Sequence, residues 1–280
     1  MNYDTLEDFF GDIVGKAKRG LGISDSRLEK ETGLSSAQIS EIENYELVPE
    51  DSTIQTLAHA LRLDGNKLIG IARGWLPAGG NEPYDTSELQ IERVVLDAGM
   101  VVNAYILKCK KSGSGAIVDA GGQAEKILNK AEDMSVKPTH LFLTHGHGDH
   151  TGALRELKSA TGAKVFCSEE DMGLLGSSKT LVDALVDDTW GERVGELSVT
   201  GAGLPGHTSG GFGYGTSGVF FSGDALFAGS LGGARGNAYS GQIEVVRKKV
   251  LSLSGDTRIF PGHGPITSVE QEIEHNPYFV

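Results

Sequence analysis

Residues 144–150 read THGHGDH and place three histidines and one aspartate within seven positions. Such crowding suits a hydrophobic core poorly, because each imidazole needs partners for two ring nitrogens, but it suits a metal site well. The preceding residues read as a buried strand that ends in a loop. Glycine spacers would let this loop bend tightly, so that His145 and His147 face one centre. Asp149 and His150 would then face another, and the stretch predicts a metal centre beside a strand end.

Further candidate ligands follow in short motifs bounded by glycine or proline. PGHTSGG contains His207, FFSGDALF contains Asp224 at the end of a predicted strand, and FPGHGP contains His263 at the end of another. A ligand set of imidazoles and carboxylates without thiolates suits zinc, iron or manganese. Cys109 and Cys167 lie far apart and outside any CxxC pattern, so neither a disulfide framework nor a zinc–thiolate site is expected.

The order HxHxDH, Pro-Gly-His-Thr, Ser-Gly-Asp and Pro-Gly-His-Gly-Pro resembles the signature of the metallo-β-lactamase superfamily, over about residues 88–280. Within that superfamily, GDALFAGS, PGHGPIT and the terminal EHNPYF are most similar to short bacterial proteins of the glyoxalase II type. The resemblance implies an α/β fold, the αββα sandwich, and two divalent metal ions. It also implies a metal-dependent hydrolase, in which an activated water attacks a small-molecule substrate with an activated acyl bond, such as a thioester or a lactone.

Carried over residue by residue, the resemblance assigns one metal to His145, His147 and His207, and a second to Asp149, His150 and His263, with Asp224 bridging. It marks the two carboxylates Asp149 and Asp224 as catalytic. The loop residues Tyr214 and Arg235 are candidate substrate contacts. Asp119, at another predicted strand end, is either a partner that orients a ligand histidine or a simple turn residue.

Two departures from the glyoxalase II pattern leave the substrate open. Only 17 residues follow His263, where glyoxalase II continues into a helical domain that helps hold glutathione, and the usual arginine is displaced to Arg235 in a glycine-rich loop. We expect the segment from Asp171 to Glu196 to form a lid, and the acidic side chains of SEEDMG (168–173) and VDALVDD (182–188) to be solvated. A mononuclear iron enzyme similar to the persulfide dioxygenases, using His145, His207 and Asp224, is an alternative.

The first 75 residues have helical periodicity and predict a small all-α domain of five helices, followed by a linker over 76–88 and the metallo-β-lactamase-like domain over 89–280. Residues 4–73 resemble the phage-repressor type of helix-turn-helix domain. Ser24, Ser35 and Ser52 are expected to cap the second, third and fourth helices, and Gly33 to end the second. A regulator that senses a metabolite or a metal and reads DNA is therefore a further alternative.

Charge argues against nucleic acid as a partner. The chain has a net charge of −13, and residues 1–75 contain 13 acidic and 8 basic side chains. The helix expected to read DNA, Ser35 to Tyr45, has no Lys or Arg, whereas DNA readers present a basic surface. We therefore favour homo-oligomerisation through the N-terminal helices, as a dimer, over DNA binding. The acidic N-terminus and the lack of long apolar runs predict a cytoplasmic protein without a membrane partner.

Overall fold

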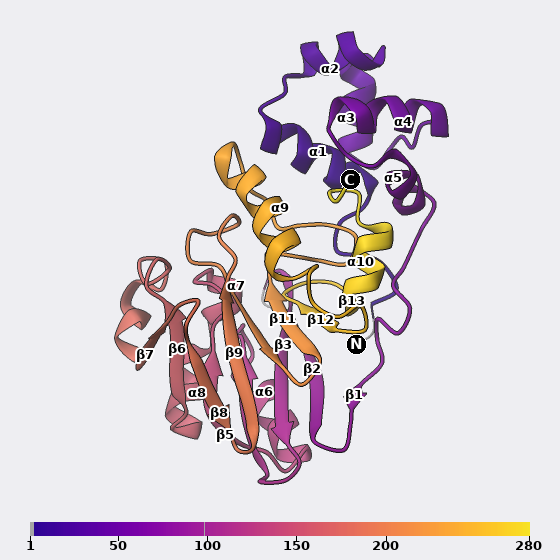
Figure 1. Cartoon of the computed structure of the whole chain (residues 1–280). Helices are drawn as coiled ribbons and strands as arrows, with labels where there is room; N and C mark the ends of the chain where they lie inside the picture. The colour runs from indigo at the N-terminus through magenta and orange to yellow at the C-terminus, as the bar shows by residue number, and fades with distance from the viewer. Residues whose placement is uncertain (1–2, 98) are drawn as a thin grey trace.

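Two β-sheets packed face to face, with helices on their outer sides, form the body of the structure (Figure 1). The computed structural model describes residues 3–97 and 99–280. The arrangement confirms the αββα sandwich expected from the sequence. The helices are α1 (Phe10–Leu21), α2 (Asp25–Thr32), α3 (Ser36–Glu43), α4 (Asp51–Ala60), α5 (Gly65–Ala72), α6 (Ala124–Asp133), α7 (Gly148–Thr151), α8 (Leu154–Thr161), the 3₁₀ helix η1 (Gly176–Leu181), α9 (Asn237–Lys249) and α10 (Val269–His275).

The first sheet has seven strands in chain order: β1 (Tyr84–Asp85), β2 (Leu89–Asp97), β3 (Val101–Cys109), β4 (Ser114–Val118), β5 (Lys137–Phe142), β6 (Lys164–Ser168) and β7 (Ala184–Val186). Strands β1 to β4 pair antiparallel, whereas β4 to β7 pair parallel. Parallel neighbours need crossover connections, and these contain α6 between β4 and β5, α7 and α8 between β5 and β6, and η1 between β6 and β7. The carboxyl ends of β4, β5 and β6 therefore open on one edge of the sheet, where their loops can meet.

The second sheet has the order β13-β12-β11-β10-β9-β8. Its strands are β8 (Gly191–Val194), β9 (Leu197–Gly203), β10 (Phe212–Thr216), β11 (Val219–Gly223), β12 (Arg258–Pro261) and β13 (Thr267–Ser268). Strands β11 and β12 are parallel to each other, and the remaining pairs are antiparallel. The residues that follow β11 and β12 consequently leave the sheet at the same edge.

Apolar side chains fill three layers of the sandwich. Tyr105, Phe142, Phe166, Tyr214 and Phe221 belong to a cluster of aromatic and aliphatic side chains between the sheets. A second cluster lies between the first sheet and the helices α6 and α8. The third lies outside the second sheet, against α9 and α10, and continues into the N-terminal helices. Burial of these side chains supplies the main favourable term in folding.

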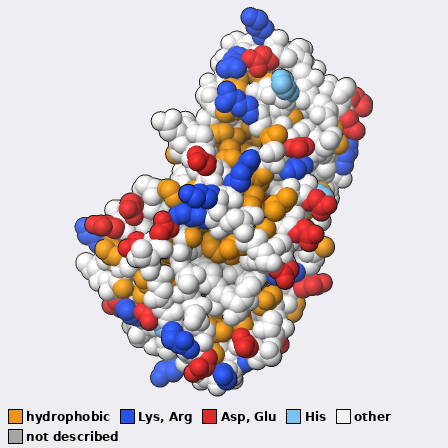
Figure 2. Space-filling model, viewed as in Figure 1, with side chains coloured by type: hydrophobic (Ala, Val, Ile, Leu, Met, Phe, Trp, Pro, Cys, Tyr) orange, Lys and Arg blue, Asp and Glu red, His pale blue; other side chains and the backbone are white. Residues whose placement is uncertain are grey.

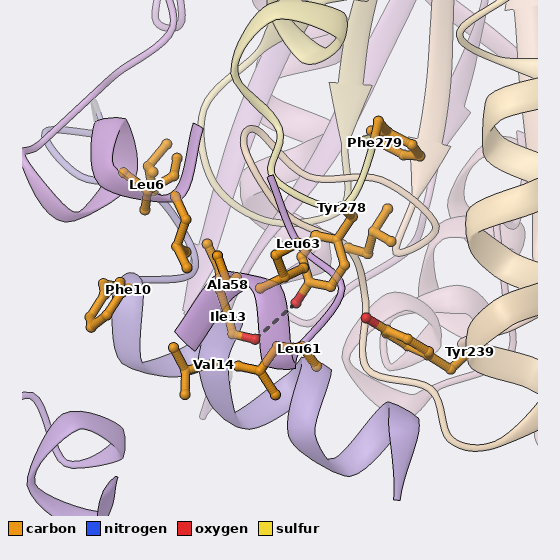
Figure 3. Close-up of a cluster of buried hydrophobic side chains, with 14 of the residues drawn as sticks. Leu6, Phe10, Ile13, Val14, Ala58, Leu61, Leu63, Tyr239, Tyr278 and Phe279 are labelled. Carbon is orange, nitrogen blue, oxygen red and sulfur yellow. Dashed lines mark hydrogen bonds between the residues drawn. The ribbon is translucent and has the colours of Figure 1, made fainter. Parts of the chain in front are cut away.

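The N-terminal helical unit, residues 3–75, shares the third cluster with the C-terminal end of the chain (Figure 3). Ile13, Leu61 and Tyr278 are all buried there, and the Tyr278 hydroxyl donates a hydrogen bond to the backbone carbonyl of Ile13, 3.3 Å away. Lys67 donates to the backbone carbonyl of Phe279. The unit is therefore packed onto the sandwich by a continuous hydrophobic core.

Local signals in the N-terminal unit agree with the structure in most places. Ser24 and Ser35 cap α2 and α3 through their hydroxyls, and Gly33 ends α2 in the left-handed region with φ of 75°. The expected cap at Ser52 is wrong, because α4 begins earlier and Glu50 is its N-cap residue. Three residues separate α2 from α3, as the resemblance to helix-turn-helix proteins implies, but that family assignment stays a prediction.

Two expectations about connecting segments need correction. Strand β1 lies inside the stretch predicted as a linker, so the first sheet already begins at Tyr84. The segment from Asp171 to Glu196 is no free lid, because it contains β7, which pairs with β6, and β8, which pairs with β9. Among the helices of residues 3–97 and 99–280, none has the length and apolar character that crossing a membrane requires.

Candidate metal centre

Loops from both sheets bring the predicted ligands to one edge of the sandwich. His145 and His147 follow β5, and the short helix α7 carries Asp149 and His150. From the second sheet, Asp224 follows β11, His263 follows β12, and His207 lies in the loop between β9 and β10. The open edge expected from the strand directions is therefore where the candidate ligands gather.

The seven side chains form three overlapping groups, and within each group the candidate ligand atoms lie within 4.8 Å of one another. The first and third groups are the two sets that the sequence predicted. The second contains Asp224 with one histidine from each set, as a bridging carboxylate would require. The groups are His145, His147 and His207; His145, His150 and Asp224; and Asp149, His150 and His263.

Distances between the ring nitrogens fit coordination of an ion. His147 Nδ1 lies 3.1 Å from His145 Nε2 and 3.0 Å from His207 Nε2, and the Nε2 atoms of His150 and His263 are 3.2 Å apart. Nitrogens that bind one tetrahedral zinc ion, at about 2.0 Å each, are about 3.3 Å apart. The spacing therefore suits a cation placed between each set of nitrogens.

The outer nitrogens of four of these histidines already have oxygen partners. The Nδ1 atom of His207 lies 3.1 Å from the Gly233 carbonyl, and that of His263 lies 2.6 Å from the Val101 carbonyl. Those of His145 and His150 face side-chain oxygens. A proton on the outer nitrogen leaves the lone pair on the inner Nε2, which is how histidines are oriented around metals.

The surroundings of the Asp224 carboxylate fit a bound cation. This carboxylate is buried, and its Oδ1 atom has no hydrogen-bond partner within the described part of the chain. This oxygen lies 3.3 Å from His150 Nε2, and Oδ2 lies 3.5 Å from His207 Nε2. A buried carboxylate oxygen left without a partner is costly, and a shared metal ion would satisfy it.

The carboxylates make one end of the site strongly attractive to positive charge. Burial by itself lowers the pKa of His263, but Asp224 and Asp149 outweigh it and raise this pKa to about 11. The same competition, with Asp224 and Asp119, raises the pKa of His150 to about 10. His145, where burial dominates, has its pKa lowered to about 3. A divalent cation would replace the protons that these carboxylates attract.

Comparison with known proteins identifies the family. The model of the Metallo-beta-lactamase superfamily matches residues 97–263, more than half of the chain. The chain belongs to the metallo-beta-lactamase superfamily. Among relatives of this superfamily, the chain is 36% identical to the hydroxyacylglutathione hydrolase GloC of Haemophilus influenzae over 185 residues, which cover 59% of this chain and 87% of that one.

Two solved structures extend the comparison. TTHA1623 in a di-iron-bound form has a TM-score of 0.56 and 28% identity, and the match covers 67% of this chain and 99% of that one. ETHE1 from Myxococcus xanthus has a TM-score of 0.59 and 27% identity, with 67% of this chain and 83% of that one covered. The chain is thus a metallo-hydrolase of the metallo-beta-lactamase superfamily, and its histidine and aspartate groups fit a dinuclear metal site.

Asp119 holds the ring of His150, one of the candidate metal ligands. Its Oδ2 atom lies 2.8 Å from His150 Nδ1, and its carboxylate also accepts hydrogen bonds from the backbone N–H and the hydroxyl of Thr144. Asp119 adopts a φ of 60°, an unusual conformation for a residue with a side chain. Of the two readings left open by the sequence, the geometry favours a residue that orients a histidine.

Asp171 is the functional neighbour that sequence reasoning missed, because its acidic stretch was expected to be solvated. It is fully buried, and its carboxylate accepts hydrogen bonds from the Gly146 N–H at 2.9 Å, the Thr208 hydroxyl at 2.8 Å and the Gly210 N–H at 2.8 Å. It therefore ties the loop of His145 to the loop of His207. A signal was present in its position three residues after β6, at the edge where the strands of the sheet open.

The structure contradicts one of the two candidate substrate contacts, Tyr214, and leaves the other, Arg235, as a prediction. Tyr214 lies between the sheets with no exposed surface, stacks on Phe142 and donates its hydroxyl hydrogen bond to the Leu143 carbonyl. Its assignment as a substrate contact is therefore wrong, because alternation along β10 turns this side chain into the core. Arg235 is exposed in the loop before α9, two residues after Gly233, and stays a candidate.

Proposed function

We propose that the protein is a dinuclear metallo-hydrolase that cleaves an activated acyl bond, with a thioester as the first candidate and a lactone as the second. The buried carboxylate of Asp224 carries the proposal, because its Oδ1 atom has no hydrogen-bond partner among the described residues and its two oxygens lie near histidines of two separate sets, each of which could hold one cation. The similarity to a hydroxyacylglutathione hydrolase supports the thioester. The seven predicted ligands, with Asp149 and Asp224 as catalytic carboxylates, are part of this proposal.

Two bound divalent ions would lower the pKa of a shared water toward about 7 and polarise a substrate carbonyl. The chain's own residues would hold and orient the reactants. A hydrogen bond with His263 lowers the pKa of Asp149 to about 2, so its carboxylate is ionised at neutral pH and available to a cation. The side chain of Asp149 is 22% exposed and that of His207 is 21% exposed, which places them at the accessible side of the centre.

The test combines metal analysis with thioesterase assays on the full chain. We expect two metal ions per chain in zinc-loaded protein and hydrolysis of an acyl-thioester. His150→Ala should lose at least one ion and most activity, because His150 contributes to two ligand groups. His59→Gln, in the exposed part of α4, is the matched control and should keep both. One ion or none per chain, without thioesterase or lactonase activity, would sink the proposal.

A mononuclear iron enzyme is the second candidate, because the similarity to ETHE1 is compatible with it. It would use His145, His207 and Asp224, the residues that the resemblance to persulfide dioxygenases assigns. His145 belongs to the first two groups of candidate ligands. One iron per chain together with oxygen uptake on addition of glutathione persulfide would establish this activity in place of hydrolysis.

A DNA-reading role for the helical unit has less support. The exposed positions of α3 include Ser36, Gln38, Ser40 and Glu41, and its sequence has no Lys or Arg. On the face shown in Figure 2, Lys and Arg side chains lie among Asp and Glu side chains. We expect no salt-sensitive retention of the protein on duplex DNA, since such binding depends on clustered basic groups. Homo-oligomerisation through this unit stays a prediction, which light scattering can test.

A further inference from the structure

The loop that follows Asp224, residues 225–236, contacts the metal centre on one side. The Gly232 N–H donates to the Asp224 carbonyl at 3.1 Å, and a Cβ atom at Gly232 would lie 2.0 Å from that carbonyl oxygen and 3.1 Å from the His207 ring. The neighbouring Gly233 carbonyl lies 3.1 Å from His207 Nδ1. The position of this loop therefore sets the orientation of the His207 ring.

The N-terminal helical unit holds the same loop on its other side. Asp8, which is 6% exposed, has its Oδ2 atom 2.5 Å from both the Ser230 hydroxyl and Lys16 Nζ. Lys16 also donates to the Leu231 carbonyl at 2.9 Å. At the far end of the loop, the Gly236 N–H donates to the Gly20 carbonyl at 2.9 Å. Helix α1 and the residues just before it therefore hold the loop at three points, which are Ser230, Leu231 and Gly236.

The residues just before α1 also pack against the loop that carries His263. A Cβ atom at Gly264 would lie 3.0 Å from the Cβ of Glu7, and Gly264 has a φ of 74°, so this contact requires glycine. Lys16 lies 5.1 Å from the centre of the Phe227 ring, which is 5.7 Å from the ring of His263. The N-terminal helical unit therefore contacts two ligand-bearing loops, the one that follows Asp224 and the one that carries His263.

These contacts come from outside the part of the chain that defines its family. The superfamily model begins at residue 97, and the Haemophilus influenzae relative matches 59% of the chain. Apolar packing docks the unit (Figure 3), but a hydrophobic interface alone would need no buried carboxylate. Burial of Asp8 costs desolvation energy, and of its two partners Ser230 lies on the loop that orients His207, whereas Lys16 of α1 reaches the same loop through the Leu231 carbonyl.

We propose that the N-terminal helical unit is a positioning element of the metal centre, and that Asp8 is the positioning residue through which it fixes the loop and, by way of Gly233, the ring of His207. This inference rests on the proposed role of His207 as a metal ligand. It gives the unit a function within the enzyme itself, independent of any partner macromolecule.

The test measures zinc affinity by competition with a chelating dye, at a temperature where every variant is folded. Asp8→Asn keeps the shape of the side chain but removes the charge, and should weaken zinc binding about tenfold, the lower end of effects from residues that support metal ligands. Ser230→Ala removes the hydroxyl that donates a hydrogen bond to Asp8 and should weaken zinc binding several-fold. Asp25→Asn is the control, because Asp25 pairs with Lys18 of α1 and not with the loop.

A purely structural role would lower the thermal midpoint of the metal-free protein and leave zinc affinity unchanged. Wild-type affinity in both Asp8→Asn and Ser230→Ala therefore overturns the proposal. If Asp8→Asn does not fold, Ser230→Ala decides, since it removes only one hydroxyl. Failure of the wild-type protein to bind zinc would overturn the proposed metal centre as well, whereas zinc binding with unaffected variants overturns this inference alone.

Discussion

The substitution Asp171→Asn should destabilise the protein even in its metal-free form. The Asp171 carboxylate accepts three hydrogen bonds in a fully buried position, two on Oδ2 from Gly146 and Thr208 and one on Oδ1 from Gly210. An asparagine can keep its carbonyl oxygen at the Oδ2 position. Its amide group would then face the Gly210 N–H, so that two donors oppose each other.

The magnitude follows from this single mismatch. A hydrogen bond to a charged group contributes about 1.5–3 kcal/mol, and a buried donor without a partner costs about 1–3 kcal/mol. Because the two terms partly describe the same loss, we expect Asp171→Asn to lower the free energy of unfolding by about 2–4 kcal/mol. The two ligand loops would also separate more easily, so zinc affinity should fall together with stability.

Urea denaturation of metal-free protein, followed by circular dichroism, measures this change. Asp187→Asn is the matched control, because Asp187 also accepts hydrogen bonds, from the N–H and hydroxyl of Thr189, but in an exposed loop. It should leave the midpoint nearly unchanged. If Asp171→Asn unfolds at the same urea concentration as the wild type, the buried carboxylate does not join the two loops and the reasoning fails.

Three further predictions concern metal, pH and the docked unit. Removal of metal with a chelator should abolish hydrolase activity and lower the thermal midpoint, and added zinc should restore both; activity that survives complete metal removal would contradict the proposed chemistry. Burial raises the pKa of Glu272 to about 7 from 4.5, so the folded state binds the proton more tightly and stability should fall as pH rises from about 4.5 to 7. Glu272→Gln should flatten the dependence of the unfolding free energy on pH, measured by denaturation at several pH values. If that dependence is the same as in the wild type, Glu272 is not the group responsible for it. Tyr278→Phe removes the buried hydrogen bond to Ile13 and should lower the free energy of unfolding by about 1 kcal/mol, measured by urea denaturation, whereas an unchanged value would mean that the hydroxyl contributes nothing to docking.

Local signals predicted the α/β character of the larger domain and the strand-end positions of several ligand candidates, whereas the αββα sandwich and the pairing of the seven ligands into two sets followed from the resemblance to the metallo-β-lactamase superfamily. Short apolar strands bounded by glycine or proline mark the sheet edges, and in parallel strands those edges coincide. His145, Asp224 and His263 each follow such a strand within three residues. Local patterns therefore place each of these side chains at a strand end, but the meeting of His145 of the first sheet with Asp224 and His263 of the second depends on how the two sheets pack.

Other features depended on tertiary contacts that no local pattern reveals. Asp171 resembles the solvated acidic residues beside it, and only its three donors from distant loops make it buried. Tyr214 lies in a glycine-rich stretch that reads as a loop but forms β10. The shared core of the helical unit and the sandwich was hidden for the same reason, since helical periodicity shows that a face is apolar but not what covers it.

That shared core has a consequence for proteolysis. The connection around residues 85–88 is exposed, and a protease that cut there would release no soluble pieces, because the interface shown in Figure 3 would still hold both parts together. The nicked chain should migrate as one species under native conditions and as two in denaturant. Two separately produced fragments, ending and beginning at this connection, would then reassemble into a working enzyme, a form of complementation that a flexibly tethered domain could not provide.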